Sequence, residues 1–317
     1  MVKSSSFYFP SKDGKTRIRA REWYGDGEPK AVVELIHGIA EHIDRYDAFA
    51  SFLAEQGYYV VGHDILGHGK SVAGEAEKGS FDVVGGWFTN VADLRFLFEL
   101  TREKYPDLPY FMLGHSMGSF LLRSYVPSYG EELSGVILSG TGYVPNMALK
   151  LGQMVAGMEI KKNGDHAKSE ALRKMAFGGY NKKIPNPESE NAWLSRDPAT
   201  YNAYDADPDC GFLPTALTYR EMFRGIEFIQ SPKSLIRWHK DLPVLLLSGS
   251  MDPVGSYGEG VRRVRADLGA AGVYNTKMKL YDGGRHEMLN EINKADVFDD
   301  ILYWLEEQQG EKEYDDA

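Results

Sequence analysis

The segment Gly114-His115-Ser116-Met117-Gly118 has the Gly-x-Ser-x-Gly form, with an apolar run before it and a helical pattern after it. Residues 110–113 are predicted to form a buried strand and residues 117–129 a helix. A serine in so tight a strand-to-helix turn has strained backbone geometry, and the residues two positions away must be very small. The turn exposes the hydroxyl at a helix amino terminus, which favours a developing anion. We therefore predict Ser116 as a nucleophile, with a purely structural capping serine as the alternative.

A serine hydroxyl needs a base, and the base needs an orienting acid. When the nucleophile occupies this kind of turn, the acid and then the histidine follow it along the chain. Outside residues 141–237, the histidines after Ser116 are His239 and His286. His286 follows the predicted strand 276–281 and so lies at the carboxyl edge of the sheet. His239 precedes a strand and belongs to the opposite edge, so we predict His286 as the base.

The acid should also follow a strand at the carboxyl edge. Asp252 comes soon after the apolar segment 242–248, whereas Asp282 ends a strand but sits too close in sequence to His286. We therefore predict Asp252 as the orienting acid. A turn or a helix cap before Pro253 is the alternative role for this side chain.

An oxyanion hole for the reaction needs two backbone N–H groups. The residue after the nucleophile, Met117, supplies one of them, and a loop after an earlier strand supplies the other. The loop of residues 37–42 follows the apolar segment 31–36, and Gly38 lets its backbone approach the site closely. We therefore predict the amide of Ile39 as the second donor. His37 precedes the nucleophile in sequence and is predicted to hydrogen-bond within its own loop.

Two other groups of reactive side chains have no catalytic role in this scheme. Residues 62–71 contain two histidines and an aspartate, but the glycines among them indicate a rigid loop that supports the oxyanion strand rather than a metal site. Cys210 is the single cysteine, and no paired base is visible near it. We expect neither a metal ion nor an organic cofactor.

Strands and helices that alternate along the chain must position these residues. Apolar strands are predicted at residues 31–36, 58–62, 110–113, 135–138, 242–248 and 276–281, after two alternating segments at 5–10 and 16–23. Amphipathic helices are predicted at residues 44–56, 86–104, 117–129, 256–268 and 293–308. Together they predict an α/β fold with a mostly parallel sheet and helices on both faces.

The strand pattern stops between residues 141 and 237, where helices are predicted at 147–158, 167–177 and 218–228. The predicted organisation is therefore a core of residues 1–140 and 238–309, a helical cap at 141–237, and an acidic, frayed tail at 310–317. An insertion that follows a strand lies above the carboxyl edge of the sheet, where open α/β sheets bind ligands. The insertion is thus a candidate cap over a pocket.

The amino-acid composition limits the classes of partner that the protein can bind. The 317 residues carry a net charge of −10, which disfavours nucleic acid. With one cysteine, no signal peptide at the amino terminus and no apolar run near the ~20 residues of a membrane helix, we expect a cytoplasmic protein. The apolar stretch 147–160 has three interpretations: it lines an acyl channel, it touches a membrane surface transiently, or it packs on the core.

The segments 37–42, 62–71, 114–118, 252–255 and 285–291 occur in an order that resembles the monoacylglycerol lipase and lysophospholipase branch of the α/β-hydrolases, of serine aminopeptidase S33 type. The resemblance implies an α/β-hydrolase fold with Ser116, Asp252 and His286 as the triad and the Ile39 and Met117 amides as the oxyanion hole. The chain departs from the mammalian lipases at Ile39-Ala40, where a small residue and a glycine are usual, and at Ser119, where another glycine is common. The larger Ile39 would narrow the acyl pocket.

These residues predict a serine hydrolase that cleaves a small-molecule carboxylic ester or lipid through an acyl-enzyme. The function that these residues favour first is that of a monoacylglycerol lipase or a lysophospholipase-like esterase. A soluble carboxylesterase for short-chain or aromatic esters is the alternative, and a non-catalytic binding protein on a hydrolase scaffold is a third. Peptidases and carbon–carbon hydrolases with this triad often carry a Gly-Gly-Pro-Gly-like oxyanion loop, which residues 37–42 do not match.

Overall fold

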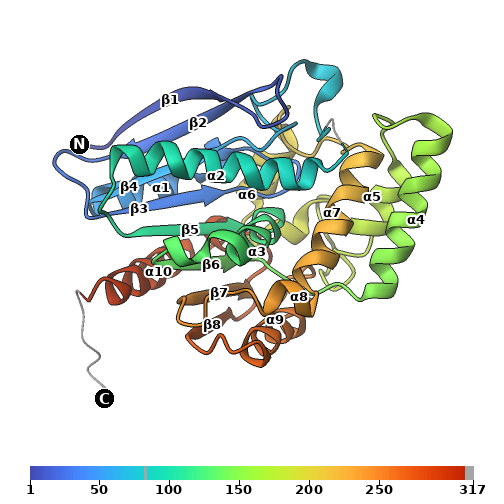
Figure 1. The fold of residues 1–317 in the computed structure, drawn as a ribbon. Helices are drawn as coiled ribbons and strands as arrows, with labels where there is room; N and C mark the ends of the chain where they lie inside the picture. Colours follow the sequence, from blue (N-terminus) through green and yellow to red (C-terminus); the bar gives the residue numbers. More distant parts are fainter. Residues whose placement is uncertain (82–83, 311–317) are drawn as a thin grey trace.

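The computed structural model describes residues 1–81 and 84–310. Within them, eight strands form one sheet in the order β1-β2-β4-β3-β5-β6-β7-β8 (Figure 1). The strands from β3 onward pair in parallel, while β1 and β2 form an antiparallel extension at one end. The carboxyl ends of six strands therefore share one edge. The strands are β1 Lys3–Pro10, β2 Arg17–Tyr24, β3 Ala31–Ile36, β4 Tyr58–His63, β5 Tyr110–His115, β6 Gly135–Ser139, β7 Val244–Gly249 and β8 Thr276–Tyr281.

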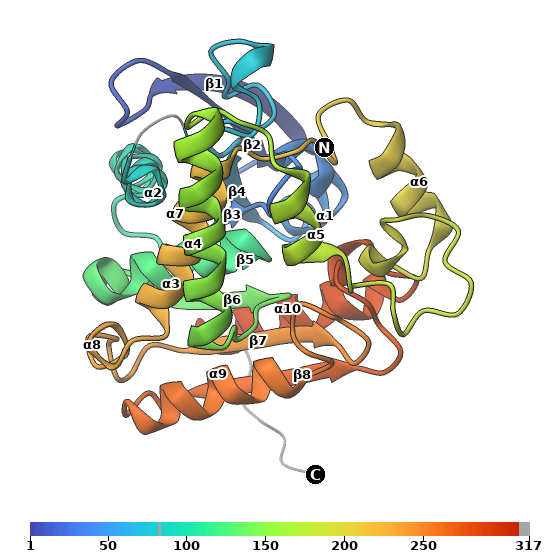
Figure 2. The ribbon, with the colours of Figure 1, turned by 90° about the vertical axis from the view of Figure 1, so that its right-hand side faces the viewer.

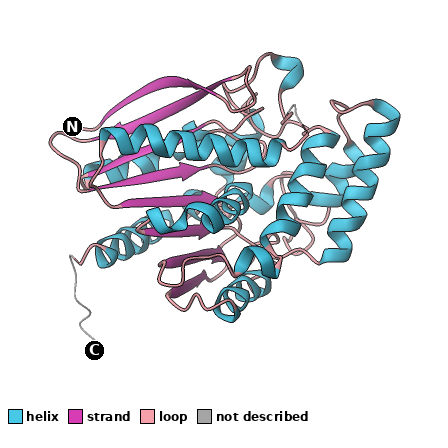
Figure 3. Cartoon of the chain, viewed as in Figure 1, coloured by secondary structure: helices cyan, strands magenta, loops and turns pink. Residues whose placement is uncertain are grey.

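Helices cover both faces of the sheet (Figure 3). Strand β3 shows how the apolar runs fit this arrangement: Val32 and Ile36 join the core on one face, and Val33 and Leu35 join the core on the other. Both faces are dry, so each residue of the strand is buried. One face is covered by α2 Gly86–Lys104, α3 Met117–Tyr129 and α9 Glu259–Ala270, and the other by α1 Asp47–Glu55 and α10 Lys294–Gln308.

The chain leaves the sheet after β6 and returns at β7, and the segment between is helical. Figure 2 looks onto the carboxyl edge of the sheet, where α4, α5 and α7 lie in front of the strands and α6 lies to one side. The helices of this segment are α4 Asn146–Asn163, α5 Glu170–Phe177, α6 Pro198–Ala206, α7 Ala216–Ile229 and the short α8 Pro232–Leu235.

Glycines let the helices of this segment pack closely. A Cβ atom on Gly225 of α7 would lie 2.1 Å from the Trp87 ring of α2. A Cβ on Gly152 of α4 would lie 2.6 Å from the Phe223 ring of α7. Helix α7 therefore packs directly on the core, and α4 is stacked outside it. We propose residues 141–237, which include these helices, as a cap.

The predicted fold class is confirmed: the sheet is mostly parallel and has helices on both faces. Helix α6 was not predicted, because residues 181–212 are rich in Pro, Asn and Asp. Its start is nevertheless encoded locally, since the Asp197 side chain accepts a hydrogen bond from the Ala199 N–H and Pro198 occupies the first turn. The predicted acidic tail lies outside the described residues, apart from Gly310. Across residues 1–81 and 84–310, no helix is both long and apolar enough to cross a membrane.

Candidate active site

Ser116 lies in the tight turn between β5 and α3. Its backbone has φ 53° and ψ −120°, a conformation that a non-glycine residue adopts only when its surroundings hold it. The Ser116 N–H donates to the Ser139 carbonyl (2.9 Å) at the end of β6. The Ser119 hydroxyl donates to the Ser116 carbonyl (2.6 Å). Ser119, which departs from the resembled pattern, therefore stabilises the turn.

The flanking glycines are required by backbone contacts. A Cβ on Gly114 would lie 2.5 Å from the Gly118 carbonyl oxygen, and one on Gly118 would lie 2.2 Å from the Ile36 carbonyl oxygen. Any side chain at either position would push strand and helix apart. The close backbone contacts that require glycine at both flanking positions of the Gly-x-Ser-x-Gly pattern therefore occur in this chain.

His286 and Asp252 form a buried pair in the loops after β8 and β7. The His286 Nδ1–H donates to Asp252 Oδ1 at 3.0 Å, and neither residue is more than 1% exposed. The Val254 N–H (2.8 Å) and the Ser248 hydroxyl (3.0 Å) donate to the same carboxylate. Within residues 1–81 and 84–310, His286 Nε2 is a buried atom with no hydrogen-bond partner. The Nε2 atom of His286 is therefore available to accept a proton from another group.

His286 and Asp252 each shift the pKa of the other. Burial alone would lower the pKa of His286, but the negative charge and hydrogen bond of Asp252 outweigh it and raise that pKa above its ordinary value. Burial alone would raise the pKa of Asp252, but the charge and hydrogen bond of His286 lower it overall. Asp252 therefore stays ionised and holds the Nδ1–H tautomer of the ring.

The loop after β3 approaches Ser116 closely. A Cβ on Gly38 would lie 3.2 Å from the Ser116 Cβ. Here the His37 Nδ1–H donates to the Gly38 carbonyl (2.7 Å), and His37 Nε2 accepts from the Ile65 N–H (2.8 Å). Burial lowers the pKa of His37 to about 4, so the ring is neutral. His37 therefore hydrogen-bonds its own loop, as predicted from the sequence.

Three charged side chains support this loop. Glu41 Oε1 accepts from the Gly38 N–H at 2.5 Å. The Arg45 guanidinium bridges Glu41 Oε2 (2.5 Å) and both carboxylate oxygens of Glu287 (2.6 and 2.7 Å). Burial would raise the pKa of Glu41, but the charge of Arg45 outweighs it and the pKa falls to about 2. The bridge ties the loop after β3 to the residue next to His286.

Ser116, His286, Ile39 and Glu41 line one cavity of about 540 Å³. Its lining mixes apolar and polar side chains. The apolar members from the proposed cap include Phe177, Trp193, Leu194, Phe212, Pro214 and Tyr219, and the polar ones include Arg173, Lys174, Asn181, Glu190 and Asn191. Among residues 1–81 and 84–310, the side chains that line this cavity include none from α4, so the stretch 147–160 does not line this cavity.

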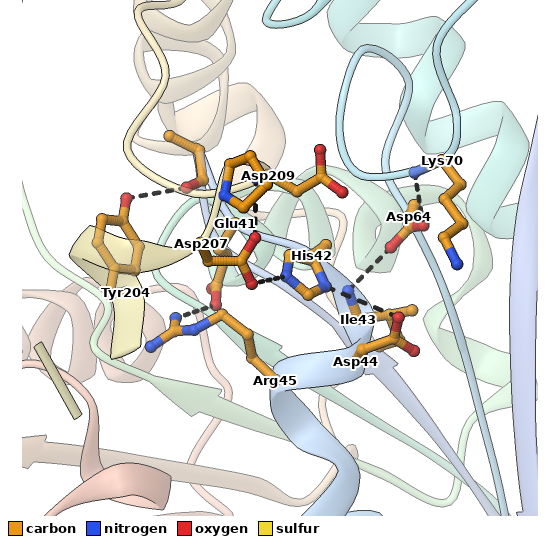
Figure 4. A network of polar contacts seen from close by, with 12 residues as sticks. Glu41, His42, Ile43, Asp44, Arg45, Asp64, Lys70, Tyr204, Asp207 and Asp209 are labelled. Carbon is orange, nitrogen blue, oxygen red and sulfur yellow. Dashed lines mark hydrogen bonds and ion pairs between the residues drawn. The ribbon is translucent and has the colours of Figure 1, made fainter. Parts of the chain in front are cut away.

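The other sequence candidates lie elsewhere. Asp282 is exposed and accepts a long contact from the Ser250 hydroxyl (3.4 Å), and His239 is exposed before β7. The loop at residues 62–71 is built around Asp64, which accepts from the Ile43 N–H (2.9 Å) and the Lys70 N–H (3.0 Å). Figure 4 shows these contacts beside the loop after β3. That loop therefore supports its neighbour, as predicted.

One group of possible metal ligands occurs in the described part of the chain. The donor atoms of His42, Asp207 and Cys210 lie within 4.8 Å of one another. His42 Nε2 already pairs with Asp207 at 2.9 Å (Figure 4). The positive charge of Arg45 acts on the Cys210 thiol, so a metal ion here would face another cation. The contact between His42 and Asp207 joins the inserted segment to the core.

A tight strand-to-helix turn with a serine at the carboxyl edge of this sheet, and a His–Asp pair whose histidine lines the same cavity, are features of the α/β-hydrolase class. The model of the family described as serine aminopeptidase, S33 matches residues 27–293. The chain therefore belongs to that family of α/β-hydrolases, as its resemblance predicted.

The chain is similar to lipases and esterases over most of its length. It is 30% identical to a monoacylglycerol lipase of Mycolicibacterium smegmatis (92% of this chain, 94% of that protein). It is 27% identical to the mouse monoglyceride lipase (90% and 85%). The solved structure of a thermostable Bacillus coagulans carboxyl esterase in complex with glycerol has a TM-score of 0.88 and 32% identity, covering 95% of this chain and 97% of that one.

Proposed function

We propose that this protein is a serine esterase that hydrolyses carboxylic esters of an apolar acyl group and a polar alcohol, of which monoacylglycerols are the leading class. The observation that carries the proposal is the buried His286–Asp252 pair: His286 lines the same cavity as Ser116, and in the described part of the chain its Nε2 has no hydrogen-bond partner. A base held in this tautomer beside a nucleophile is the arrangement that acyl transfer needs.

In the proposed reaction, Ser116 Oγ attacks the ester carbonyl carbon while His286 Nε2 takes the hydroxyl proton. The carbonyl oxygen becomes an oxyanion, held by the Ile39 and Met117 amides. Collapse breaks the bond to the alcohol oxygen, which leaves with the proton from His286. A water molecule then gives a proton to His286 Nε2 while its oxygen attacks the acyl carbon. Collapse of this second intermediate breaks the bond between the acyl carbon and Ser116 Oγ, the carboxylic acid leaves, and His286 returns the proton to Ser116 Oγ.

The mixed lining of the cavity supports an ester with two unlike halves. Aromatic side chains such as Phe177, Trp193 and Phe212 suit an acyl group, whereas Glu190 and Asn191 offer hydrogen bonds to hydroxyls. Relatives named monoacylglycerol lipase, and the related esterase solved with glycerol, are consistent with a glycerol-like leaving group.

A carboxylesterase for short-chain or aromatic esters is the second candidate. Ile39 lines the cavity where a smaller residue is usual in the resembled lipases, and its side chain takes room beside the nucleophile. The similarity to a carboxyl esterase supports this candidate as well. Both candidates use the same triad and differ only in the acyl chain they accept.

Two experiments test the proposal. A fluorophosphonate probe should label the wild type and not Ser116→Ala, and failure to label the wild type would exclude the serine hydrolase. A series of p-nitrophenyl esters from acetate to palmitate, with monoacylglycerols, should show turnover of medium or long chains and of monoacylglycerols. A maximum at acetate without monoacylglycerol turnover would select the second candidate.

A further inference from the structure

The proposed cap holds the loop that carries the oxyanion donor. The Ala40 carbonyl accepts two hydrogen bonds, from the Tyr204 hydroxyl (2.8 Å) and from the Gly211 N–H (2.9 Å). Tyr204 lies in the last turn of α6 and Gly211 follows that helix, so both donors come from the inserted segment. Figure 4 shows the Tyr204 hydroxyl pointing at the loop beside Glu41.

These two hydrogen bonds to the Ala40 carbonyl matter because the backbone of Ala40 is strained. Its φ is +55°, in the left-handed region that a residue with a side chain adopts only when other contacts hold it there. A glycine would take such a φ freely, whereas an alanine does not. In this chain the two hydrogen bonds to the Ala40 carbonyl provide the restraint that the alanine needs.

The other end of the same loop is held by the core. His37 binds the Gly38 carbonyl, which belongs to the same peptide unit as the Ile39 N–H. The C=O and N–H of a trans peptide point in opposite directions, so the Ile39 N–H is directed away from His37. The Ile39 amide thus lies between a restraint from the core at Gly38 and a restraint from the cap at Ala40.

Tyr204 is itself fixed in place. The Arg45 guanidinium lies 4.9 Å from the centre of its ring, and Arg45 is held by Glu41 and Glu287. Burial raises the pKa of Tyr204, so its hydroxyl keeps the proton it donates. The donor, its ring and the loop it binds therefore form one connected unit.

We infer that Tyr204 is a positioning residue of the oxyanion hole: through the Ala40 carbonyl it sets the direction of the Ile39 amide. The inference rests on the proposed function, because it assigns a part to a cap residue in that same reaction. The cap then contributes to transition-state stabilisation as well as covering the pocket. A role in packing alone is the alternative.

The test compares Tyr204→Phe with Tyr201→Phe. Tyr201 lies one turn earlier on α6, is also buried, and donates to Glu188 rather than to the loop after β3. Each variant is assayed for kcat and KM on a p-nitrophenyl ester and for inhibition by an alkyl trifluoromethyl ketone, whose adduct with Ser116 places an oxyanion in the hole. Thermal melting checks that both variants are folded.

We expect Tyr204→Phe to lower kcat about 5- to 20-fold, less than loss of a whole donor, because the amide remains but is poorly directed. KM should stay within about twofold, and the inhibition constant of the ketone should rise by the same factor as kcat falls. Tyr201→Phe should leave all three within about twofold of wild type.

Three results would overturn the inference. They are an unchanged kcat in Tyr204→Phe, a rise in KM alone, or an equal loss in Tyr201→Phe, which would indicate general loosening of the cap. The proposed function fails separately, if the wild type neither hydrolyses esters nor reacts with a fluorophosphonate. A labelled, active wild type with a normal Tyr204→Phe variant rejects only the role of Tyr204.

Discussion

His286 and Trp193 are joined twice, although one follows the last strand and the other lies in the proposed cap. The His286 N–H donates to the Trp193 carbonyl (3.3 Å), and the two rings lie 5.0 Å apart. The next residue repeats the backbone contact, since the Glu287 N–H donates to the Leu194 carbonyl (2.7 Å). The cap therefore fixes the histidine loop and covers one face of the imidazole.

The orientation of the imidazole by Asp252 leads to a first prediction. Asp252→Asn should lower kcat by about 10³- to 10⁴-fold with little change in KM, because the amide no longer selects the Nδ1–H tautomer. Asp282→Asn is the matched control, since this exposed aspartate also ends a strand near His286. Steady-state kinetics on one ester decides the matter, and an equal loss in Asp282→Asn would contradict the assignment.

A second prediction concerns pH. The charge of Asp252 raises the pKa of His286 against the effect of burial, and only the neutral ring accepts the serine proton. Activity should therefore rise with pH through an inflection above 6.5, the ordinary value for histidine. In the pH profile of the residual activity of Asp252→Asn, the inflection should move to lower pH. A profile of kcat/KM measures both, and a wild-type inflection below 6.5 would contradict the pairing.

The glycine at the start of α3 gives a third prediction. Gly118→Ala should destabilise the fold by about 3 kcal/mol or more, because its Cβ would lie against the Ile36 carbonyl. Gly157→Ala is the control: within the described residues, no atom outside the backbone of α4 and the two adjacent residues would lie within 4 Å of its Cβ, so it should stabilise the fold by about 0.5–1 kcal/mol. Urea unfolding followed by circular dichroism gives both values. Equal midpoints in the two variants would show that the turn tolerates a side chain.

Ile39 provides a fourth prediction, about chain length. Ile39→Ala keeps the backbone amide but removes side-chain volume from the cavity lining. The ratio of kcat/KM for the palmitate ester to kcat/KM for the acetate ester should rise about 10-fold, the lower end of the effect of one methylene group in a hydrophobic pocket. An unchanged ratio would mean that Ile39 does not limit the acyl chain.

The outer face of α4 gives a fifth prediction. Met147, Leu151, Met154 and Met158 recur at helical spacing and are each at least 50% exposed. We propose that this stripe makes transient contact with a membrane surface. The double variant Leu151→Glu/Met154→Glu should lose cosedimentation with phosphatidylcholine vesicles and keep its rate on p-nitrophenyl acetate. Ile236→Glu, at an exposed position outside α4, should keep both; equal vesicle binding in all three proteins would reject the proposal.

Local patterns were enough to predict the sheet. Strand β3 is apolar at every position except Glu34 because both its faces are dry. Ser116 stands in a turn whose glycines are required by contacts within a few residues or with the adjacent strand. Such signals are present in the sequence itself. The roles of Ser116, His286 and Asp252 stay predictions, and the structure brings His286 into contact with Asp252 and into one cavity with Ser116.

The supports of the site were not predicted, because they join residues that are far apart in sequence. Arg45 and Glu287 are separated by 242 positions, and Tyr204 and Ala40 by 164. No periodicity links such pairs, and a lone arginine or tyrosine in a loop reads as surface. Helix α6 was missed for a related reason: its polar composition resembles a loop, and its buried residues, Tyr201 and Tyr204, pack in two small clusters with other residues of the inserted segment.

The insertion between β6 and β7 also bears on how the molecule forms. Val136 and Val244 are partners in adjacent strands although about 100 residues separate them, so their pairing must close a long loop. Contacts of such range form late in folding. Ser116 lies before the loop, whereas Asp252 and His286 lie after it. During refolding, the nucleophile turn should therefore assemble early, and recovery of activity should follow the docking of β7 and β8.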